Sequence, residues 1–311
     1  MTSTSEARAT TSGEQVASLS TGVDICYETF GDPAADPLLL VMGLGGPMTW
    51  WNPDFCRMLA DNGFYVIRFD NRDVGRSSKI PHRVTRKTLV RAFSGLKVRA
   101  PYTLSDMAAD GFALLDHLGL GSAHLLGISM GGMIVQTMAL DDPSRVRSLT
   151  SIMSTTGRRS VGWQDPRLAP MLLAKRQKSR EAYIETSARL WKMIGSPLYP
   201  DTADTVRERA AETFDRGVDP AGVMRQMLAV VAQPDRSRHL RGLRIPALVI
   251  HGTNDRMVHV SGGRATARAI PGCELLLVPG MGHDLPIPLH ETFVDAIRRN
   301  ADRSAKAAKN K

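Results

Sequence analysis

The stretch "HLLGISMGGM", residues 124–133, decides the fold. An apolar run ends just before Ser129, and a helical pattern of apolar residues starts directly after it. The serine therefore occupies a sharp turn from a buried strand into a helix. Such a turn strains and crowds the backbone, and Gly127 and Gly131, two positions before and after the serine, relieve the crowding. The pattern predicts a serine nucleophile at a helix N-terminus, where the helix dipole favours developing negative charge.

Short apolar runs alternate with helical patterns on both sides of this turn. Alternation of this kind predicts a mostly parallel central sheet flanked by helices, the α/β class. A hairpin of two strands around Thr21 and Gly22 is expected at one edge of the sheet. The buried strands are expected at residues 37–43, 64–70, 122–129, 145–154, 246–252 and 274–280.

The alternation stops between residues 155 and 240, where every pattern is helical. Because this block falls between two strands, it is expected to form a cap, or lid, over the strand ends. Residues 14–154 and 241–300 then form the core. A polar, disordered N-terminus is expected at residues 1–13, and a basic, disordered tail at residues 301–311.

The composition places the chain among globular proteins, with 42% hydrophobic and 23% charged residues. The first fifteen residues lack the apolar segment of a secretory signal, and no apolar run is long enough to span a membrane. Cys26, Cys56 and Cys273 are an odd and scattered set without metal-ligand spacing, which suits a reducing compartment. The expected location is the cytoplasm, either free or peripheral to a membrane.

The net charge of +9 is local rather than general. Residues 74–105 contain eight Lys or Arg and no acid, and residues 298–311 contain six basic residues against one acid. The rest of the chain is slightly acidic. No nucleic-acid reader motif accompanies the basic stretches, so a nucleic-acid partner is not expected.

An attacking serine needs a histidine base and an acid that orients the histidine. Asp255 follows the strand at residues 246–252, and His283 follows the next strand, so both loops are expected at the same sheet edge as Ser129. The order serine, acid, histidine is the one that this kind of sheet uses. Asp284 is a rival acid, but its side chain is unlikely to turn toward the ring of its sequence neighbour.

The oxyanion of a tetrahedral intermediate needs two backbone N–H donors. One is expected from Met130, directly after the nucleophile. The other is expected from Leu44, in the glycine-rich loop "MGLGGPM" at the end of an early strand.

Five motifs occur in the order "VMGLGG", "RFDNRDVGRS", "GISMGG", "HGTNDRMV" and "PGMGHDLP". Together they resemble the α/β-hydrolase superfamily, and most of all its actinobacterial aclacinomycin-methylesterase-like carboxylesterases and lipases. The resemblance implies the α/β-hydrolase fold with an inserted helical cap. It also implies that Asp70, Arg72 and Gly75 form a structural loop beside the site. Many members have His-Gly before the oxyanion loop, where this chain has Met42 and Gly43. This difference bears on which subgroup of the superfamily the chain resembles, rather than on catalysis.

The predicted function is hydrolysis of carboxylic esters through an acyl-enzyme intermediate, with no metal or organic cofactor. The apolar side chains of the cap favour a small-molecule or lipid ester with an apolar acyl or alcohol part. A thioesterase, a carbon–carbon bond hydrolase and a perhydrolase use the same triad, so they remain alternatives. The alternative of another class is a hydrolase-like binding protein without catalysis, although such proteins usually lose a triad residue.

The basic segment at residues 76–99 has two interpretations. Leu89, Phe93 and Leu96 have helical spacing and are flanked by cations, a pattern typical of a helix that binds weakly to anionic membrane surfaces. Alternatively, the stripe packs on the cap and the segment is only structural. The sequence favours the structural interpretation, because a run of charges is more often a solvated helix face than a membrane-binding surface. Oligomeric state is not predicted.

Overall fold

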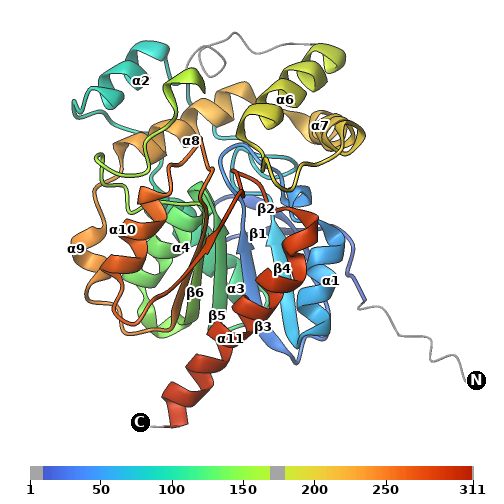
Figure 1. Cartoon of the computed structure of the whole chain (residues 1–311), viewed down its shortest axis with the longest axis vertical. Coiled ribbons are helices and arrows are strands. Elements are labelled where there is room, and N and C mark those ends of the chain that lie inside the picture. Colours follow the sequence, from blue (N-terminus) through green and yellow to red (C-terminus); the bar gives the residue numbers. More distant parts are fainter. Residues whose placement is uncertain (1–9, 169–178, 310–311) are drawn as a thin grey trace, which may run out of the picture.

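The computed structural model describes residues 10–168 and 179–309, which form an eight-stranded sheet with helices on both faces (Figure 1). The strand order is β1-β2-β4-β3-β5-β6-β7-β8, with β1–β2 and β2–β4 antiparallel and every other pairing parallel. This confirms the predicted fold class and the edge hairpin. The strands are β1 Gln15–Ser18, β2 Asp24–Phe30, β3 Asp36–Val41, β4 Phe64–Phe69, β5 Ala123–Ile128, β6 Val146–Ile152, β7 Ala247–Gly252 and β8 Glu274–Val278.

The helices divide between the two faces of the sheet and a layer above it. Helices α3 and α4 cover one face, while α1 and α11 cover the other (Figure 1). The helices are α1 Pro53–Asp61, α2 Arg86–Phe93, α3 Leu104–His117, α4 Met130–Asp141, α6 Arg180–Ile194, α7 Ala203–Gly217, α8 Pro220–Ala232, α9 Ser237–Leu240, α10 Ser261–Ala269 and α11 His290–Lys309.

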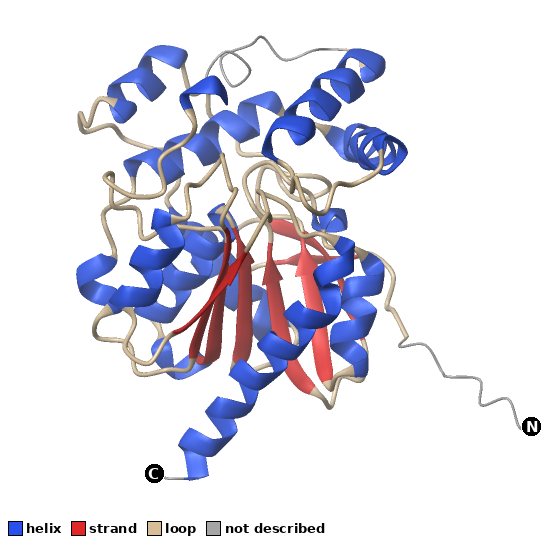
Figure 2. Cartoon of the chain, in the orientation of Figure 1, coloured by secondary structure: helices blue, strands red, loops and turns tan. Residues whose placement is uncertain are grey.

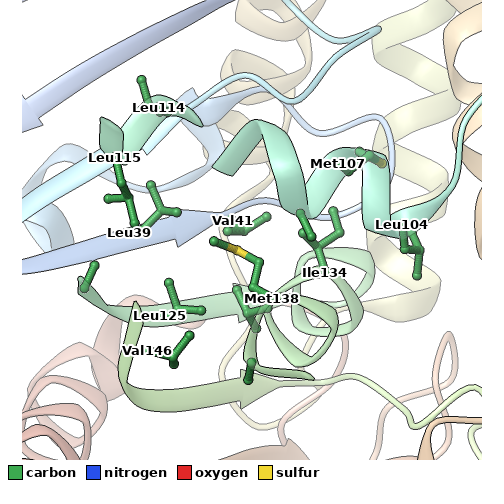
Figure 3. Close-up of a cluster of buried hydrophobic side chains, with 14 of the residues drawn as sticks. Leu39, Val41, Leu104, Met107, Leu114, Leu115, Leu125, Ile134, Met138 and Val146 are labelled. Carbon is green, nitrogen blue, oxygen red and sulfur yellow. The ribbon is translucent and has the colours of Figure 1, made fainter. Parts of the chain in front are cut away.

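The central strands are apolar on both faces because each face is covered by helices. Leu39 of β3 and Leu125 of β5 are register partners and point into the cluster beneath α3 and α4, as Figure 3 shows. Leu40 and Leu126, one residue further along, belong to the cluster on the opposite face. This period of two in paired strands explains why their sequences read as continuous apolar runs.

Helices α6, α7 and α8 lie over the edge at which the parallel strands end (Figure 2). The described residues between β6 and β7 contain no strand. The packing of two helices differs from the predicted domain limits, however. Helix α9, predicted in the cap, contributes Leu240 to the core cluster that also contains Leu243. Helix α2, predicted in the core, packs Leu89 against Leu228 of α8 and therefore belongs to the cap layer.

The predicted disorder at both ends needs correction within the described residues. Thr11 pairs with Phe30, and the Ser12 N–H donates to the Thr29 carbonyl (3.0 Å), so the chain is ordered against β2 before residue 14. At the other end, α11 continues through the predicted tail to Lys309. Four alanines among residues 301–309 explain this continuation, because alanine has the highest helix propensity. Among the described helices, none is both long and apolar enough to cross a membrane.

Candidate active site

Ser129 occupies the turn between β5, which ends at Ile128, and α4, which begins at Met130. Its φ of +55° is a conformation that residues other than glycine rarely adopt, and its N–H donates to the Ile152 carbonyl (2.9 Å). Such strain persists only where the surrounding structure enforces it, and it is common at functional sites.

The two glycines flanking this turn are required by space. A Cβ atom on Gly127 would lie 2.2 Å from the Gly131 carbonyl oxygen, and a Cβ atom on Gly131 would lie 2.0 Å from the carbonyl oxygen of Val41. Both distances are far inside van der Waals contact. The glycines therefore let the start of α4 approach β5 and β3 closely enough to raise the serine out of the sheet edge.

The structure brings Ser129, His283 and Asp255 together in one hydrogen-bonded series. The Ser129 Oγ lies 3.1 Å from the His283 Nε2, and the His283 Nδ1 lies 2.8 Å from the Asp255 Oδ2. His283 comes from the loop after β8, and Asp255 from the loop after β7. The loops that follow parallel strands lie at one edge of the sheet. Asp255 and His283 therefore meet Ser129 there, although both are at least 126 positions from it in the sequence.

Asp255 is fully buried but remains ionised. Burial raises the pKa of its carboxyl group, while the electrostatic interaction with the His283 ring and hydrogen bonds from His251 and His283 lower it more strongly, to about 2. The other carboxylate oxygen, Oδ1, accepts hydrogen bonds from the N–H groups of Met257 and Val258 (2.8 Å each). These contacts hold the carboxylate in place and keep its charge available to the imidazole.

His251 is a neighbour of Asp255 that the sequence analysis did not single out. Its side chain is buried, with Nε2 2.8 Å from the Val258 carbonyl oxygen and 3.4 Å from the Asp255 Oδ2. His251 and Asp255 are four residues apart in "HGTND", and this spacing was the available signal. The His251 ring therefore lies beside the same carboxylate oxygen, Oδ2, that the His283 Nδ1 contacts.

The rival acid Asp284 is occupied elsewhere. Its carboxylate accepts hydrogen bonds from the Ser196 N–H (3.0 Å) and the Ser196 hydroxyl. Ser196 follows helix α6, and the His283 N–H donates to the Ile194 carbonyl at the end of that helix (2.7 Å). The loop that carries His283 is thus bonded to the cap, and Asp284 serves that attachment.

The loop after β3 approaches Ser129 closely. A Cβ atom on Gly43 would lie 3.2 Å from the Ser129 Cβ, and the loop turns through a hydrogen bond from the Gly46 N–H to the Gly43 carbonyl (3.2 Å). Gly45, with φ of +66°, allows this turn. Within residues 10–168 and 179–309, no acceptor is bonded to the N–H groups of Leu44 or Met130.

The cap is joined to this loop by Gln226, a fully buried residue of α8 that the sequence did not single out. Its Oε1 accepts a hydrogen bond from the Gly45 N–H (2.8 Å), and its Nε2 donates to the Arg72 carbonyl (2.9 Å). Arg225 and Gln226 are the two polar residues of α8, whose other residues are apolar or small. That difference was the signal in the sequence.

Two buried ion pairs attach the cap to the "DNRDVGRS" segment. The Arg216 Nη2 of α7 lies 2.7 Å from the Asp70 Oδ2, and Arg225 of α8 makes two hydrogen bonds to Asp73 (2.8 Å each). Arg72 instead pairs with Asp110 of α3 (2.6 and 2.7 Å). These contacts are consistent with the structural role expected for this segment. They also attach the cap to the core.

The comparisons with known proteins agree with this fold. Residues 36–288 match the family model described as the alpha/beta hydrolase fold. The chain is 30% identical to rhodomycin D methylesterase DauP of Streptomyces sp. (strain C5) and 29% identical to rhodomycin D methylesterase DnrP of Streptomyces peucetius, covering 88% of this chain and 94% of the relative in each case. The chain therefore belongs to the alpha/beta hydrolase fold family.

A solved structure shows the same fold. The enol-lactonase from Burkholderia xenovorans LB400 superposes with a TM-score of 0.72 at 21% identity, covering 92% of this chain and 99% of that chain. The family match and the methylesterase relatives confirm the resemblance found in the sequence. They also confirm that the chain is an enzyme of the hydrolase class.

Proposed function

We propose that this hydrolase cleaves carboxylic esters, with Ser129 as nucleophile, His283 as general base and Asp255 as the group that orients the imidazole. The hydrogen-bonded series from the Ser129 Oγ to the buried Asp255 carboxylate is the observation that carries this proposal. Asp255 holds the Nδ1 of His283 as the protonated nitrogen, which leaves the Nε2 free to accept the serine proton.

In the first half of the reaction, the Ser129 Oγ bonds to the ester carbonyl carbon while its proton moves to the His283 Nε2. The carbon–oxygen bond to the alcohol then breaks, and the alcohol oxygen takes that proton. In the second half, water attacks the acyl carbon and gives a proton to His283, which returns it to the Ser129 oxygen as the carboxylic acid leaves. The products are one alcohol and one acid, with the enzyme regenerated.

The Leu44 and Met130 N–H groups are proposed to hold the oxyanion of both tetrahedral intermediates. Two observations support this: both N–H groups lie beside Ser129, and neither has an acceptor within the described part of the chain. Donors placed before the reaction begins need no reorganisation as charge develops on the carbonyl oxygen.

The substrate is proposed to be an ester with an apolar acyl or alcohol part, and a methyl ester is the first candidate because two relatives are named rhodomycin D methylesterases. Apolar side chains of the cap lie next to the site. Val223 of α8 contacts Gly45, and Trp191 of α6 packs edge-to-face on Trp50 with ring centroids 5.4 Å apart. The enzyme is proposed to work in the cytoplasm, where its three free cysteines stay reduced.

Labelling with a fluorophosphonate tests the nucleophile directly, followed by a panel of methyl esters, acyl-chain esters and thioesters. We expect one label per chain on Ser129 and none on Ser129→Ala. Ser144→Ala, which removes an exposed serine in the turn after α4, is the matched control and should label and hydrolyse like the wild type. Faster turnover of thioesters than of the matched oxygen esters would assign the chain to the thioesterase alternative, and no labelling would favour the non-catalytic one.

A further inference from the structure

The segment of residues 83–99, here called the α2 surface, exposes apolar side chains among cations. Val90 is 63% exposed, Phe93 54% and Leu96 53%. These are three of the eight large hydrophobic side chains identified as exposed among the described residues, and they fall within seven positions of the chain. Single exposed apolar residues are ordinary, but a group of them marks a contact surface.

The exposed apolar residues are not needed to hold α2 on the protein. The helix packs through another face, on which Leu89 and Ala92 are buried against Leu228 of α8. Val90 and Phe93, at a spacing of three, share a different face that begins with Arg86. The Arg159 guanidinium donates to the carbonyl oxygens of Ala92 and Phe93 (2.8 and 2.9 Å), so the end of the helix is fixed as well.

The cations of this segment form no ion pair with any residue that the structure describes. All six are exposed, and in the described part of the chain none forms an ion pair. By contrast, Arg216 and Arg225 of the cap are both paired with carboxylates. The six are Arg83, Arg86, Lys87, Arg91, Lys97 and Arg99.

Two of these cations occupy positions that destabilise their own helix. Arg86 and Lys87 occupy the first turn of α2, which contains no acidic residue. Positive charge at a helix N-terminus opposes the helix dipole and is unfavourable. Their position is therefore better explained by attraction to something outside the chain than by folding.

An apolar hollow of about 400 Å³ adjoins these cations. Val84 and Met224 form part of its wall, together with Pro220 and Ala221 at the start of α8, while Arg83 and Arg86 lie beside them. An apolar recess with two guanidinium groups matches a ligand that has an anionic group next to hydrocarbon.

We propose that the α2 surface docks on an anionic lipid bilayer. The cations contact headgroup phosphates, and Val90, Phe93 and Leu96 enter the boundary between headgroups and acyl chains. The α2 surface lies at the end of the molecule opposite the C-terminus, so docking would turn the cap toward the bilayer (Figure 1). A nucleic acid would use the charges and could stack a base on Phe93, the one aromatic residue of the segment, but it would gain nothing from Val90 and Leu96.

Vesicle co-sedimentation of the full chain tests the proposal, and Ser129→Ala separates docking from ester hydrolysis because it should sediment like the wild type. We expect binding to vesicles of phosphatidylcholine with phosphatidylglycerol, none to phosphatidylcholine alone, and weaker binding as salt rises. Changing Arg86, Lys87, Arg91 and Lys97 to glutamine should lower the partition coefficient on the order of a hundredfold or more. Changing Val90, Phe93 and Leu96 to serine should lower it on the order of tenfold.

The matched control changes the same amount of charge on other faces: Arg238, Arg264, Arg268 and Arg299, all exposed, become glutamine. This control should bind within a few-fold of the wild type, and all variants should keep the wild-type circular dichroism spectrum. Equal binding to neutral vesicles, or equal loss in the control, overturns the proposal. Two results together would also overturn it: vesicle binding that is unchanged when Val90, Phe93 and Leu96 become serine, and tight binding of the wild type to duplex DNA. The surface would then bind polyanions through its charges alone.

Discussion

The side chain of Gln226 holds the backbone of Gly45 across the boundary between cap and core, with the Gln226 Oε1 2.8 Å from the Gly45 N. The residue after Leu44 is therefore fixed by a cap helix rather than by the sheet. Because the same amide also donates to the Arg72 carbonyl, one buried side chain spans the cap, the oxyanion loop and the "DNRDVGRS" segment.

Replacing Gln226 by leucine should lower kcat roughly tenfold to a hundredfold, with a smaller change in KM, because a misplaced Leu44 N–H weakens contact with the transition state more than with the substrate. Met227→Leu on the same helix is the matched control and should keep the wild-type kcat. The measurement is steady-state hydrolysis of a small ester beside thermal unfolding. A Gln226→Leu variant that loses stability but keeps kcat would make the residue purely structural.

The buried pair of Asp73 and Arg225 should matter more for stability than any exposed pair. Asp73→Asn leaves the Arg225 charge with Asp219 as its remaining partner, and we expect a loss of about 3 kcal/mol in the free energy of unfolding. Asparagine tolerates the positive φ of position 73 (71°), so the backbone is preserved. Denaturant unfolding measures the loss.

The exposed pair of Arg180 and Asp215 provides the comparison for that experiment. Both side chains are about half exposed, and Arg180→Gln should cost far less stability than Asp73→Asn because solvent screens the pair. Equal losses from Asp73→Asn and Arg180→Gln would mean that the cap is not held by its buried ion pairs.

His124 should make the fold sensitive to acid. Its ring is buried, with Nδ1 2.8 Å from the Ser148 Oγ, and burial lowers its pKa from 6.5 to about 4. Between these values the unfolded chain binds the proton more readily than the folded protein does. The stability present above pH 6.5 is therefore lost as the pH falls toward 4, by about 3 kcal/mol.

His124→Gln keeps a hydrogen-bonding group near Ser148 but does not titrate. Urea unfolding at pH 7.0 and pH 4.5 should show a smaller acid loss in this variant than in the wild type. Acid losses of the same size in both proteins would assign the sensitivity to other groups.

The meeting of Ser129, Asp255 and His283 could be predicted from sequence because the three residues follow strands of one parallel sheet. The ends of those strands meet at one edge whatever the sequence between them, so Ser129, Asp255 and His283 needed only their strand assignments. The glycines around Ser129 were predictable for a similar reason, since the local turn alone requires them.

The contacts between cap and core could not be predicted in this way. Gln226 lies 181 residues from Gly45, and Arg225 lies 152 residues from Asp73. No shared strand register relates the cap helices to the loops beneath them, so their contacts depend on tertiary packing. The helical stripe expected in the basic segment is only partly formed, because α2 ends at Phe93 and Gly95 takes a φ of +81°. Leu96 therefore does not continue the helical stripe, although it is exposed beside it.

The central claim is that Ser129 and His283 act as one unit, and a double-variant cycle in kcat tests it most directly. Ser129→Ala and His283→Ala should each lower kcat on the order of a millionfold, and the double variant should lose no more than either single variant, because each alone disables the same proton transfer. A Ser129→Ala variant that retains a tenth of wild-type ester hydrolysis, or losses that add in the double variant, would contradict the account.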